Sequence, residues 1–199
     1  MKTLISIKNQ ENLIEEKKGF IVGACEDGTI YFSPKKNAYI LEVEQNNIQW
    51  LQTLQTAFFV AYNKKCRIDK KKSGYFRLSC YSKNIYNDIL NARKDFSRVL
   101  RKSDDYKIGF LQGVFDAEGS VHNKRLSIRV YSKKKKLISL IGILLEELGI
   151  KAGKVHTDKR TNVLMLPIYG KQNLKLFRQK INFAHNKKEY RLKNLLQES

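Results

Sequence analysis

The sequence predicts an α+β protein made of two related halves, each an αββαββα unit whose four strands form an antiparallel sheet. Residues 109–119 read GFLQGVFDAEG, and residues 19–28 repeat this stretch in the weaker form GFIVGACEDG. The same order of predicted helices and hairpins follows both copies. The copies start 90 residues apart (109 − 19), and the tyrosines that end the second hairpins, Tyr81 and Tyr169, are 88 apart (169 − 81). Because a drift of two residues is a small insertion or deletion, the spacing also supports an internal duplication.

Each copy predicts a helix with a bare face. Gly19 and Gly23 in the first copy, and Gly109 and Gly113 in the second, are four residues apart and share one side of a helix. Such a face lets another backbone approach closely. We expect the two glycine faces to pack on each other, and the first helix to begin between residues 12 and 16.

Each copy also ends in an acid followed by glycine, Asp27-Gly28 and Glu118-Gly119. An acid at a helix C-terminus faces the negative end of the helix dipole, which disfavours a carboxylate. A local rule that is broken twice at matching places indicates function. If the two helices pack in parallel, the acids arrive side by side, and like charges there require a cation. A divalent metal is the natural candidate, although either acid alone also fits a surface carboxylate.

The first copy is followed by two predicted hairpins. Their strands are residues 29–33 with 38–45 and residues 65–69 with 74–81, and their tips are 34–37 and 70–73. A helix over 47–62 separates them, with its aromatic residues expected in the core. A helix over 83–93 follows. Strand alternation places Ile40, Glu42 and Glu44 on the outer face, together with Tyr75, Arg77, Ser79 and Tyr81.

The second half repeats this order after a charged linker. Its strands are expected at 120–124, 125–132, 154–158 and 162–169, and its helices at 109–118, 133–148 and 170–181. Leu126, Ile128 and Val130 are predicted to face inward, and Ser127, Arg129 and Tyr131 outward. The predicted domains are residues 1–93 and 106–199, with the linker at 94–105.

Composition narrows the partner. The 39 Lys and Arg against 19 Asp and Glu give a net charge of +20, which favours a polyanion: nucleic acid first, an anionic membrane surface second. The longest apolar stretches, 57–62 and 137–145, are shorter than the roughly 20 residues of a membrane span, and residues 1–10 lack the apolar core of a secretory signal. Three cysteines without a CxxC pair indicate buried thiols. We therefore expect an intracellular location, in the cytoplasm or in a eukaryotic organelle.

Residues 111–119, LQGVFDAEG, closely resemble the signature of the LAGLIDADG homing endonucleases, and the traced repeat resembles the single-chain members with two motifs. The first copy departs from the pattern. Val22 holds the family's glycine position and Cys25 its first acidic position, counted back from Asp27. Gly23 precedes Asp27 by four residues, whereas Gly113 precedes Glu118 by five. One residue is therefore missing, and the choice between Glu26 and Asp27 as the first metal ligand stays open, with Asp27 preferred because it precedes a glycine.

The resemblance implies two pseudo-twofold-related half-saddles that form one concave surface for duplex DNA. It implies a monomeric, site-specific DNA endonuclease that makes double-strand breaks with short 3′ overhangs at a long target. The degenerate first motif keeps two alternatives open: an intron RNA maturase, which would add intron RNA as a partner, and a DNA-binding protein that does not cleave.

By the same resemblance, Asp27 and Glu118 would bind Mg²⁺ or Mn²⁺, with Ca²⁺ as a non-productive substitute. Gln45 and Lys188 are candidates to position water or neutralise charge, and Asp116 either binds metal or orients a neighbouring segment. Lysine-rich tips would contact phosphates and outward strand residues base edges, although any single one also fits an ordinary solvated sheet position. The residues expected to contact DNA are Lys35, Lys36, Glu42, Glu44, Arg67, Asp69, Lys70, Lys71, Lys72, Tyr75, Arg77, Ser79, Lys124, Arg125, Ser127, Arg129, Tyr131, His156, Asp158, Lys159 and Arg160.

Overall fold

The computed structural model describes residues 2–197, with the side chains of all of these except residues 2–7 and 124. The chain forms two compact units, residues 1–113 and 114–199, and each is described by itself. The boundary lies inside one helix, α5 (Asp104–Glu118). The expected linker, 94–105, contains a short helix, α4 (Ser97–Leu100), and the start of α5.

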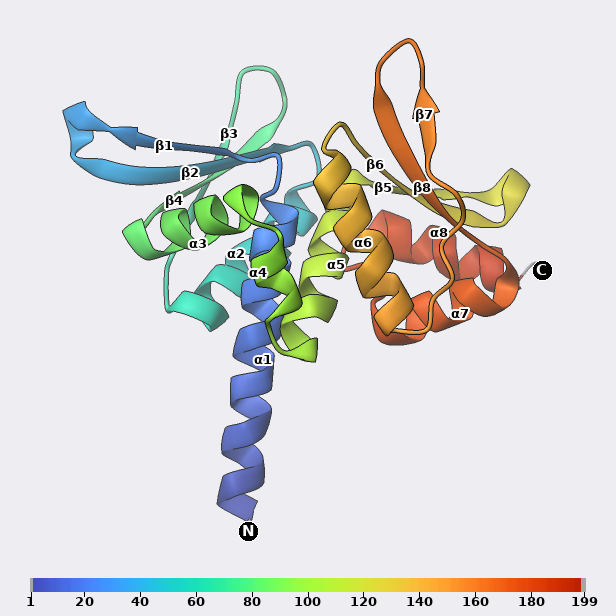
Figure 1. The fold of residues 1–199 in the computed structure, drawn as a ribbon. Coiled ribbons are helices and arrows are strands. Elements are labelled where there is room, and N and C mark those ends of the chain that lie inside the picture. Colours follow the sequence, from blue (N-terminus) through green and yellow to red (C-terminus); the bar gives the residue numbers. More distant parts are fainter. Residues whose placement is uncertain (1, 198–199) are drawn as a thin grey trace. The chain divides into compact units, whose positions relative to one another are not determined.

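The first unit is a four-stranded antiparallel sheet with helices (Figure 1). Its strands pair in the order β1-β2-β4-β3. The elements, besides α4 and the first part of α5, are α1 (Lys2–Ala24), β1 (Thr29–Ser33), the 3-10 turn η1 (Pro34–Lys36), β2 (Ala38–Gln45), α2 (Ile48–Tyr62), β3 (Arg67–Lys70), β4 (Phe76–Tyr81) and α3 (Lys83–Lys94).

The second unit repeats this topology, with strand order β5-β6-β8-β7. It confirms the predicted α+β class and the repeat. Its elements after α5 are β5 (Gly119–His122), the 3-10 turn η2 (Asn123–Arg125), β6 (Ser127–Ser132), α6 (Lys135–Glu147), β7 (His156–Asp158), β8 (Val163–Tyr169), α7 (Lys171–Lys180) and α8 (Asn186–Gln197).

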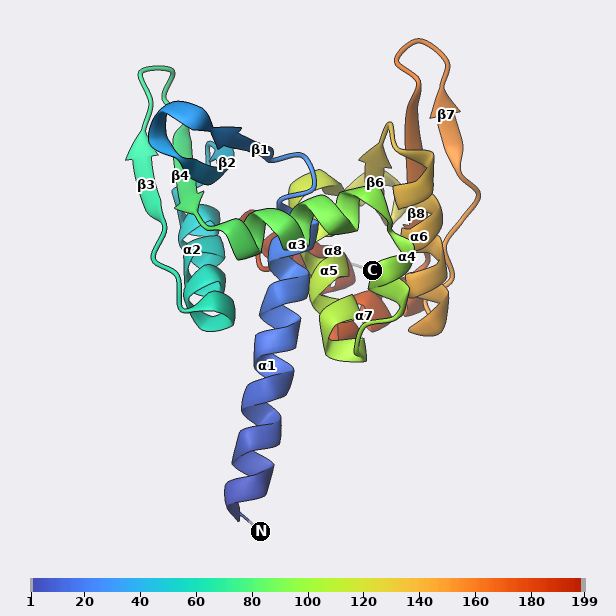
Figure 2. The same ribbon diagram turned by 60° about the vertical axis from the view of Figure 1, so that its left-hand side comes forward.

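The core of the first unit lies between its sheet and the helices α2 and α3 (Figure 2). Asn47 caps α2, because its side-chain oxygen accepts from the backbone N–H groups of Gln49 and Trp50. Phe58 is fully buried, but Phe59 is 51% exposed, so the expectation that every aromatic of this helix is in the core was wrong. The physical reason is the rotation of about 100° per residue, which carries the neighbour of a buried residue toward solvent.

Three further expectations need correction. Helix α1 begins at Lys2, not between residues 12 and 16, and the chain offers no glycine or proline before Gly19 to stop it. Ile40, expected on the exposed face, is 1% exposed, and its cross-strand neighbours are Tyr31 and Tyr81. Leu126, expected to face the core, is half-buried at a left-handed turn with φ of 41°.

The predicted contact of the glycine faces is present within residues 1–113. A Cβ added to Gly19 would lie 2.0 Å from the carbonyl oxygen of Tyr106, and one added to Gly109 would lie 1.9 Å from that of Glu16. A Cβ at Gly113 would meet the Phe20 oxygen at 2.2 Å. The contacts advance together along both helices, so α1 and the start of α5 run parallel, backbone against backbone.

We expect Gly109→Ala to lower the free energy of unfolding by at least about 1–3 kcal/mol, because the added methyl group meets backbone atoms that cannot move aside. Gly142→Ala in α6 is the matched control. A Cβ there meets nothing within 4 Å, and alanine is favoured over glycine in a helix by about 1 kcal/mol. Urea denaturation of both variants checks this, and equal stability for Gly109→Ala and the wild type would contradict the packing.

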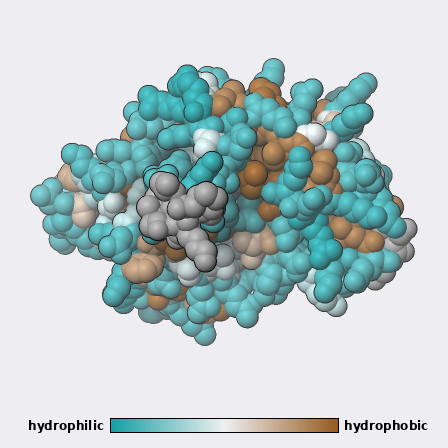
Figure 3. Space-filling model, turned by 90° about the horizontal axis from the view of Figure 1, so that it is seen from below, coloured by the Kyte–Doolittle hydropathy of each residue, from teal (hydrophilic) through white to brown (hydrophobic). Residues whose placement is uncertain are grey.

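The surface fits the composition. Most of the face seen in Figure 3 is hydrophilic. Within residues 2–197, no helix is both long enough and apolar enough to span a membrane. Cys25, Cys66 and Cys80 are free and buried, as predicted.

Candidate active site

In the first unit, the acids that follow α1 have opposite exposures. Helix α1 ends at Ala24, and a turn closes when the Gly28 N–H donates to the Cys25 carbonyl oxygen at 3.0 Å. Glu26 is 2% exposed, whereas the side chain of Asp27 is exposed. Of the two rival acids, only Asp27 is therefore accessible to a metal ion and a phosphate in solution.

Arg93, on α3, holds this turn. Its Nη2 donates to the carbonyl oxygens of Cys25 and Gly28, on both sides of Asp27. Its Nε lies 3.9 Å from the Glu26 carboxylate. Sequence reasoning missed Arg93, because an arginine near a helix C-terminus carries no signal of a partner 68 positions earlier in the chain.

In the second unit, Lys188 occupies a comparable position at the end of α5. Its Nζ donates to the carbonyl oxygens of Phe115 and Asp116, at 3.2 and 2.6 Å. Burial lowers the pKa of Lys188 to about 8, against the opposing effect of the Asp116 and Glu118 carboxylates. The structure thus places Lys188 in the electrostatic field of Glu118, which is half-buried.

Asp116 orients a neighbouring segment, which is one of the two roles predicted for it. It is 1% exposed, and its Oδ1 accepts from the backbone N–H of His185 at 3.1 Å, just before α8 begins. Glu26 has the same place in the repeat, because 26 − 19 and 116 − 109 are both seven, and it is equally buried. The missing residue of the first copy therefore falls between Glu26 and Asp27, and Asp27 matches Glu118.

Gln45 lies at the end of β2, paired with Phe76. Its Oε1 accepts from the Asn46 N–H at 2.9 Å, which leaves its amide nitrogen available as a donor. Among the described residues, no three His, Cys, Asp or Glu side chains form a ready-made metal cluster. The candidate ligands are carboxylate oxygens, and hard oxygen donors suit Mg²⁺.

Outward residues of the first sheet form an ionic network. The Arg77 guanidinium contacts Glu42 at 3.3 Å and Glu44 at 2.9 Å, and Lys71 Nζ donates to Glu44 at 2.6 Å. These hydrogen bonds, from Lys71 first, lower the pKa of Glu44. Arg67 pairs with Asp69 at 2.6 Å. The predicted contact residues of this sheet thus share one face, next to the exposed Tyr75.

Two predicted contact residues are corrected by their burial. Ser127 is fully buried where it pairs with Tyr169, and Ser79 is 7% exposed between Glu42 and Arg67. Alternation predicted their side of the strand but not how far the longer neighbouring side chains cover them. Asp158 closes the β7–β8 turn by accepting from the N–H groups of Arg160 and Thr161. The side chain of Lys124 lies outside the described residues.

The second unit has a concave basic pocket of about 680 Å³, lined by Val121, His122, Asn123, Arg125, Arg129 and Arg191. The Nε of Arg129 is buried and has no hydrogen-bond partner among the described residues. Burial and the Arg129 charge lower the pKa of His122, whose Nε2 contacts Ser120 Oγ at 2.7 Å. Three guanidinium groups at one hollow suit a phosphate, and the sequence reading had missed His122 and Arg191.

The hairpin tips are basic and exposed, as predicted. All predicted tip residues except Lys71, which is half-buried against Glu44, have exposed side chains: Lys35, Lys36, Lys70, Lys72, Lys159 and Arg160.

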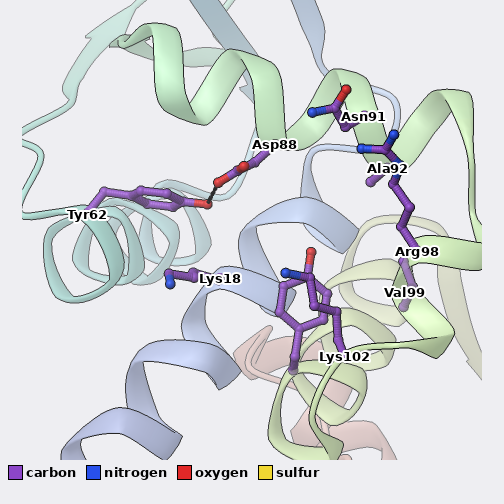
Figure 4. Close-up of a pocket in the computed structure, with 9 residues that line it drawn as sticks. Lys18, Tyr62, Asp88, Asn91, Ala92, Arg98, Val99 and Lys102 are labelled. Carbon is purple, nitrogen blue, oxygen red and sulfur yellow. Dashed lines mark hydrogen bonds between the residues drawn. The ribbon is translucent and has the colours of Figure 1, made fainter.

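A different cavity, of about 250 Å³, lies between α1, α2, α3 and α4 of the first unit (Figure 4). Tyr62 donates across it to Asp88 at 2.8 Å. Its cations already have partners: Lys18 pairs with Glu15, Arg98 with Asp95, and Lys102 lies over the Tyr106 ring. The cavity therefore lacks the uncompensated positive charge of the pocket in the second unit.

Comparisons place this chain among known proteins. Residues 105–182 match the model of a LAGLIDADG-like domain. The DNA-directed RNA polymerase subunit Rpo1C of Methanocaldococcus jannaschii is 35% identical over 121 residues, which are 61% of this chain but only 12% of that protein.

Solved structures agree in fold. The homing endonuclease I-DmoI in complex with DNA and Mn superposes with a TM-score of 0.68 at 21% identity, over 84% of this chain and 97% of that one. Other I-DmoI structures hold Mg or Ca with DNA. The N-terminal LAGLIDADG domain of DUF199/WhiA superposes with a TM-score of 0.56 at 17% identity, over 86% of this chain and 81% of that one.

Proposed function

Because this chain is a two-motif member of the LAGLIDADG family, we propose that it is a site-specific endonuclease that cleaves both strands of a long duplex DNA target with divalent metal ions. The observation that carries this proposal is the pattern of exposure at the motif ends. Asp27 is exposed and Glu118 half-exposed, while the acids just before them, Glu26 and Asp116, are buried. A protein that only binds DNA has no use for accessible carboxylates at both motif ends.

In this proposal, the Asp27 and Glu118 carboxylates are the metal ligands. Bound Mg²⁺ or Mn²⁺ would activate a water and stabilise charge on the phosphate, and Ca²⁺ would fit the same oxygens without supporting cleavage. Arg93 fixes the turn that carries Asp27, and the Lys188 cation lies in the field of Glu118. Gln45 holds a free amide donor for a water or a phosphate oxygen.

A cleavage assay tests the proposal. A plasmid library of candidate insertion sites is incubated with the protein in Mg²⁺, and linear product is sequenced. We propose that a single target is linearised by a protein that remains monomeric in solution, because one chain supplies both motifs. Specific binding without any cut would leave the second candidate.

That second candidate is a DNA-binding protein that does not cleave. The degenerate first motif favours it, and so does the likeness in fold to the DUF199/WhiA domain. The intron RNA alternative gains no support from the relatives described above and is not proposed.

Affinity for DNA is expected to fall steeply with salt, because the hairpin tips are lysine-rich. The double substitution Lys70→Ala, Lys72→Ala should lower the slope of log K against log salt by about 1.8, at about 0.9 for each phosphate contact. The matched control, Lys175→Ala with Lys193→Ala, removes two exposed helix lysines of α7 and α8 and should leave the slope unchanged. Equal slopes for the two double variants would remove this tip from the interface.

A further inference from the structure

The two sheets present different chemistry at matching positions. In β4, Ser79 and Arg77 lie two and four residues before Tyr81, and in β8, Pro167 and Met165 lie two and four residues before Tyr169. Both sets are on the outer face, because the alternate residues face the core: Leu78 is 0% exposed in β4, and Ile168 is 0% exposed in β8. A hydrophilic strand in the first unit is thus replaced by an apolar strand in the second.

The neighbouring strands differ in the same sense. Glu42 and Glu44 of β2 lie opposite Ser79 and Arg77. At the same places in the second sheet, Arg129 and Tyr131 of β6 lie opposite Pro167 and Met165. The first sheet therefore has carboxylates beside a guanidinium, and the second has no carboxylate on these two central strands.

The ionic network of the first sheet holds Arg77 in place for base readout. Two carboxylates contact its guanidinium, at 3.3 and 2.9 Å, so the side chain is oriented before DNA arrives. Arginine recognises the major-groove edge of guanine, and a neighbouring glutamate accepts from the amino group of cytosine. This face therefore has the groups that read a G·C pair.

The outer face of β8 has no such groups. Val163 and Met165 are half-buried, and Pro167 is buried beneath Gly153, where an added Cβ would lie 3.0 Å from the proline Cγ. Neither Val163 nor Met165 can donate or accept a strong hydrogen bond. The base feature that suits an apolar side chain in the major groove is the thymine methyl group.

We propose that the two halves of the DNA target are chemically unlike: the half read by the first sheet is specified at G·C pairs through Arg77, Glu42 and Glu44, and the half read by the second sheet is specified at thymines through Met165 and Val163. This rests on the proposed function, of which it names the substrate in more detail. The basic pocket at Arg129 then holds the backbone beside the thymine-reading strand, and contributes position instead of sequence.

The test measures binding, with Ca²⁺ in place of Mg²⁺. The full chain selects its preferred duplex from a randomised library, and the thymines of one half-site at a time are replaced by deoxyuridine, which removes only the methyl groups. In the half with the thymine requirement, each contacted methyl that is lost should weaken binding about fourfold. The same replacement in the other half should change nothing.

Two variants assign the halves to the sheets. Met165→Ala should abolish the sensitivity to deoxyuridine and leave the G·C preference of the other half intact. Arg77→Met should lower the preference for G·C at one position about tenfold or more and leave the deoxyuridine effect unchanged. Circular dichroism confirms that both variants are folded.

The outcomes separate this inference from the proposed function. Deoxyuridine effects that are absent, equal in both halves or unchanged by Met165→Ala overturn the inference, even if the protein cleaves its site. The predicted asymmetry without cleavage in Mg²⁺ supports the inference and overturns the endonuclease. A selection that returns no preferred sequence overturns both.

Discussion

Asp27→Asn and Glu118→Gln are each expected to abolish double-strand cleavage while DNA binding stays equal or becomes tighter. Each change removes one negative charge and one metal ligand at the end of a motif helix, and removing a negative charge near phosphates does not weaken association. The measurement is cleavage of the selected target in Mg²⁺ beside binding in Ca²⁺. We expect the loss of cleavage to reach the detection limit in both variants.

The control is Glu26→Gln. This side chain is 2% exposed and its carboxylate lies 3.9 Å from Arg93 Nε, so an amide of the same shape should keep most of the activity. Full activity in Asp27→Asn together with loss in Glu26→Gln would move the metal ligand to Glu26. Cleavage that survives in all three variants would remove the proposed mechanism.

Lys188→Met is expected to lower cleavage by about 10² to 10³-fold with little change in binding, the scale for losing one preorganised charge or donor at a reacting phosphate. Its Nζ contacts two carbonyl oxygens at the end of α5, so the substitution also removes two hydrogen bonds there. Single-turnover rates on the selected target check this, and an unchanged rate would contradict a role for the cation.

The same residue predicts a dependence on pH. The pKa of Lys188 is lowered from 10.5 to about 8, so the cation is present below pH 8 and is lost as the pH rises through that value. Cleavage that needs the cation should therefore decline above about pH 8 in the wild type. Lys188→Arg, which stays charged, should keep its rate over this range, and a parallel decline in both proteins would assign the pH effect to another group.

Stability should change with the opposite sign. Between about pH 8 and 10.5 the unfolded chain binds the Lys188 proton that the folded chain has released. The free energy of unfolding should therefore rise with pH across this window. Denaturation of the wild type against Lys188→Met, which lacks this contribution, isolates the effect.

The sequence by itself determined the repeat and most strand boundaries. The first hairpin was predicted as residues 29–33 and 38–45, and these are the observed bounds of β1 and β2. Its turn is local chemistry: Pro34 starts the 3-10 turn, and Asn37 adopts the left-handed conformation with φ of 44° that ends it. The glycine spacing likewise predicted the close approach of α1 and α5, because a bare face is a property of sequence alone.

Only the tertiary structure decided which polar residues are accessible. Ser79 and Ser127 have the correct side of their strands, but larger neighbours on adjacent strands bury them. Glu26 and Asp27 are adjacent in the chain, and it is the hydrogen bonds from Arg93 to the turn around them that accompany one acid buried and the other exposed. Alternation and motif spacing act over a few residues, whereas burial and these hydrogen bonds depend on groups about 40 to 70 positions away in the chain, which no local pattern encodes.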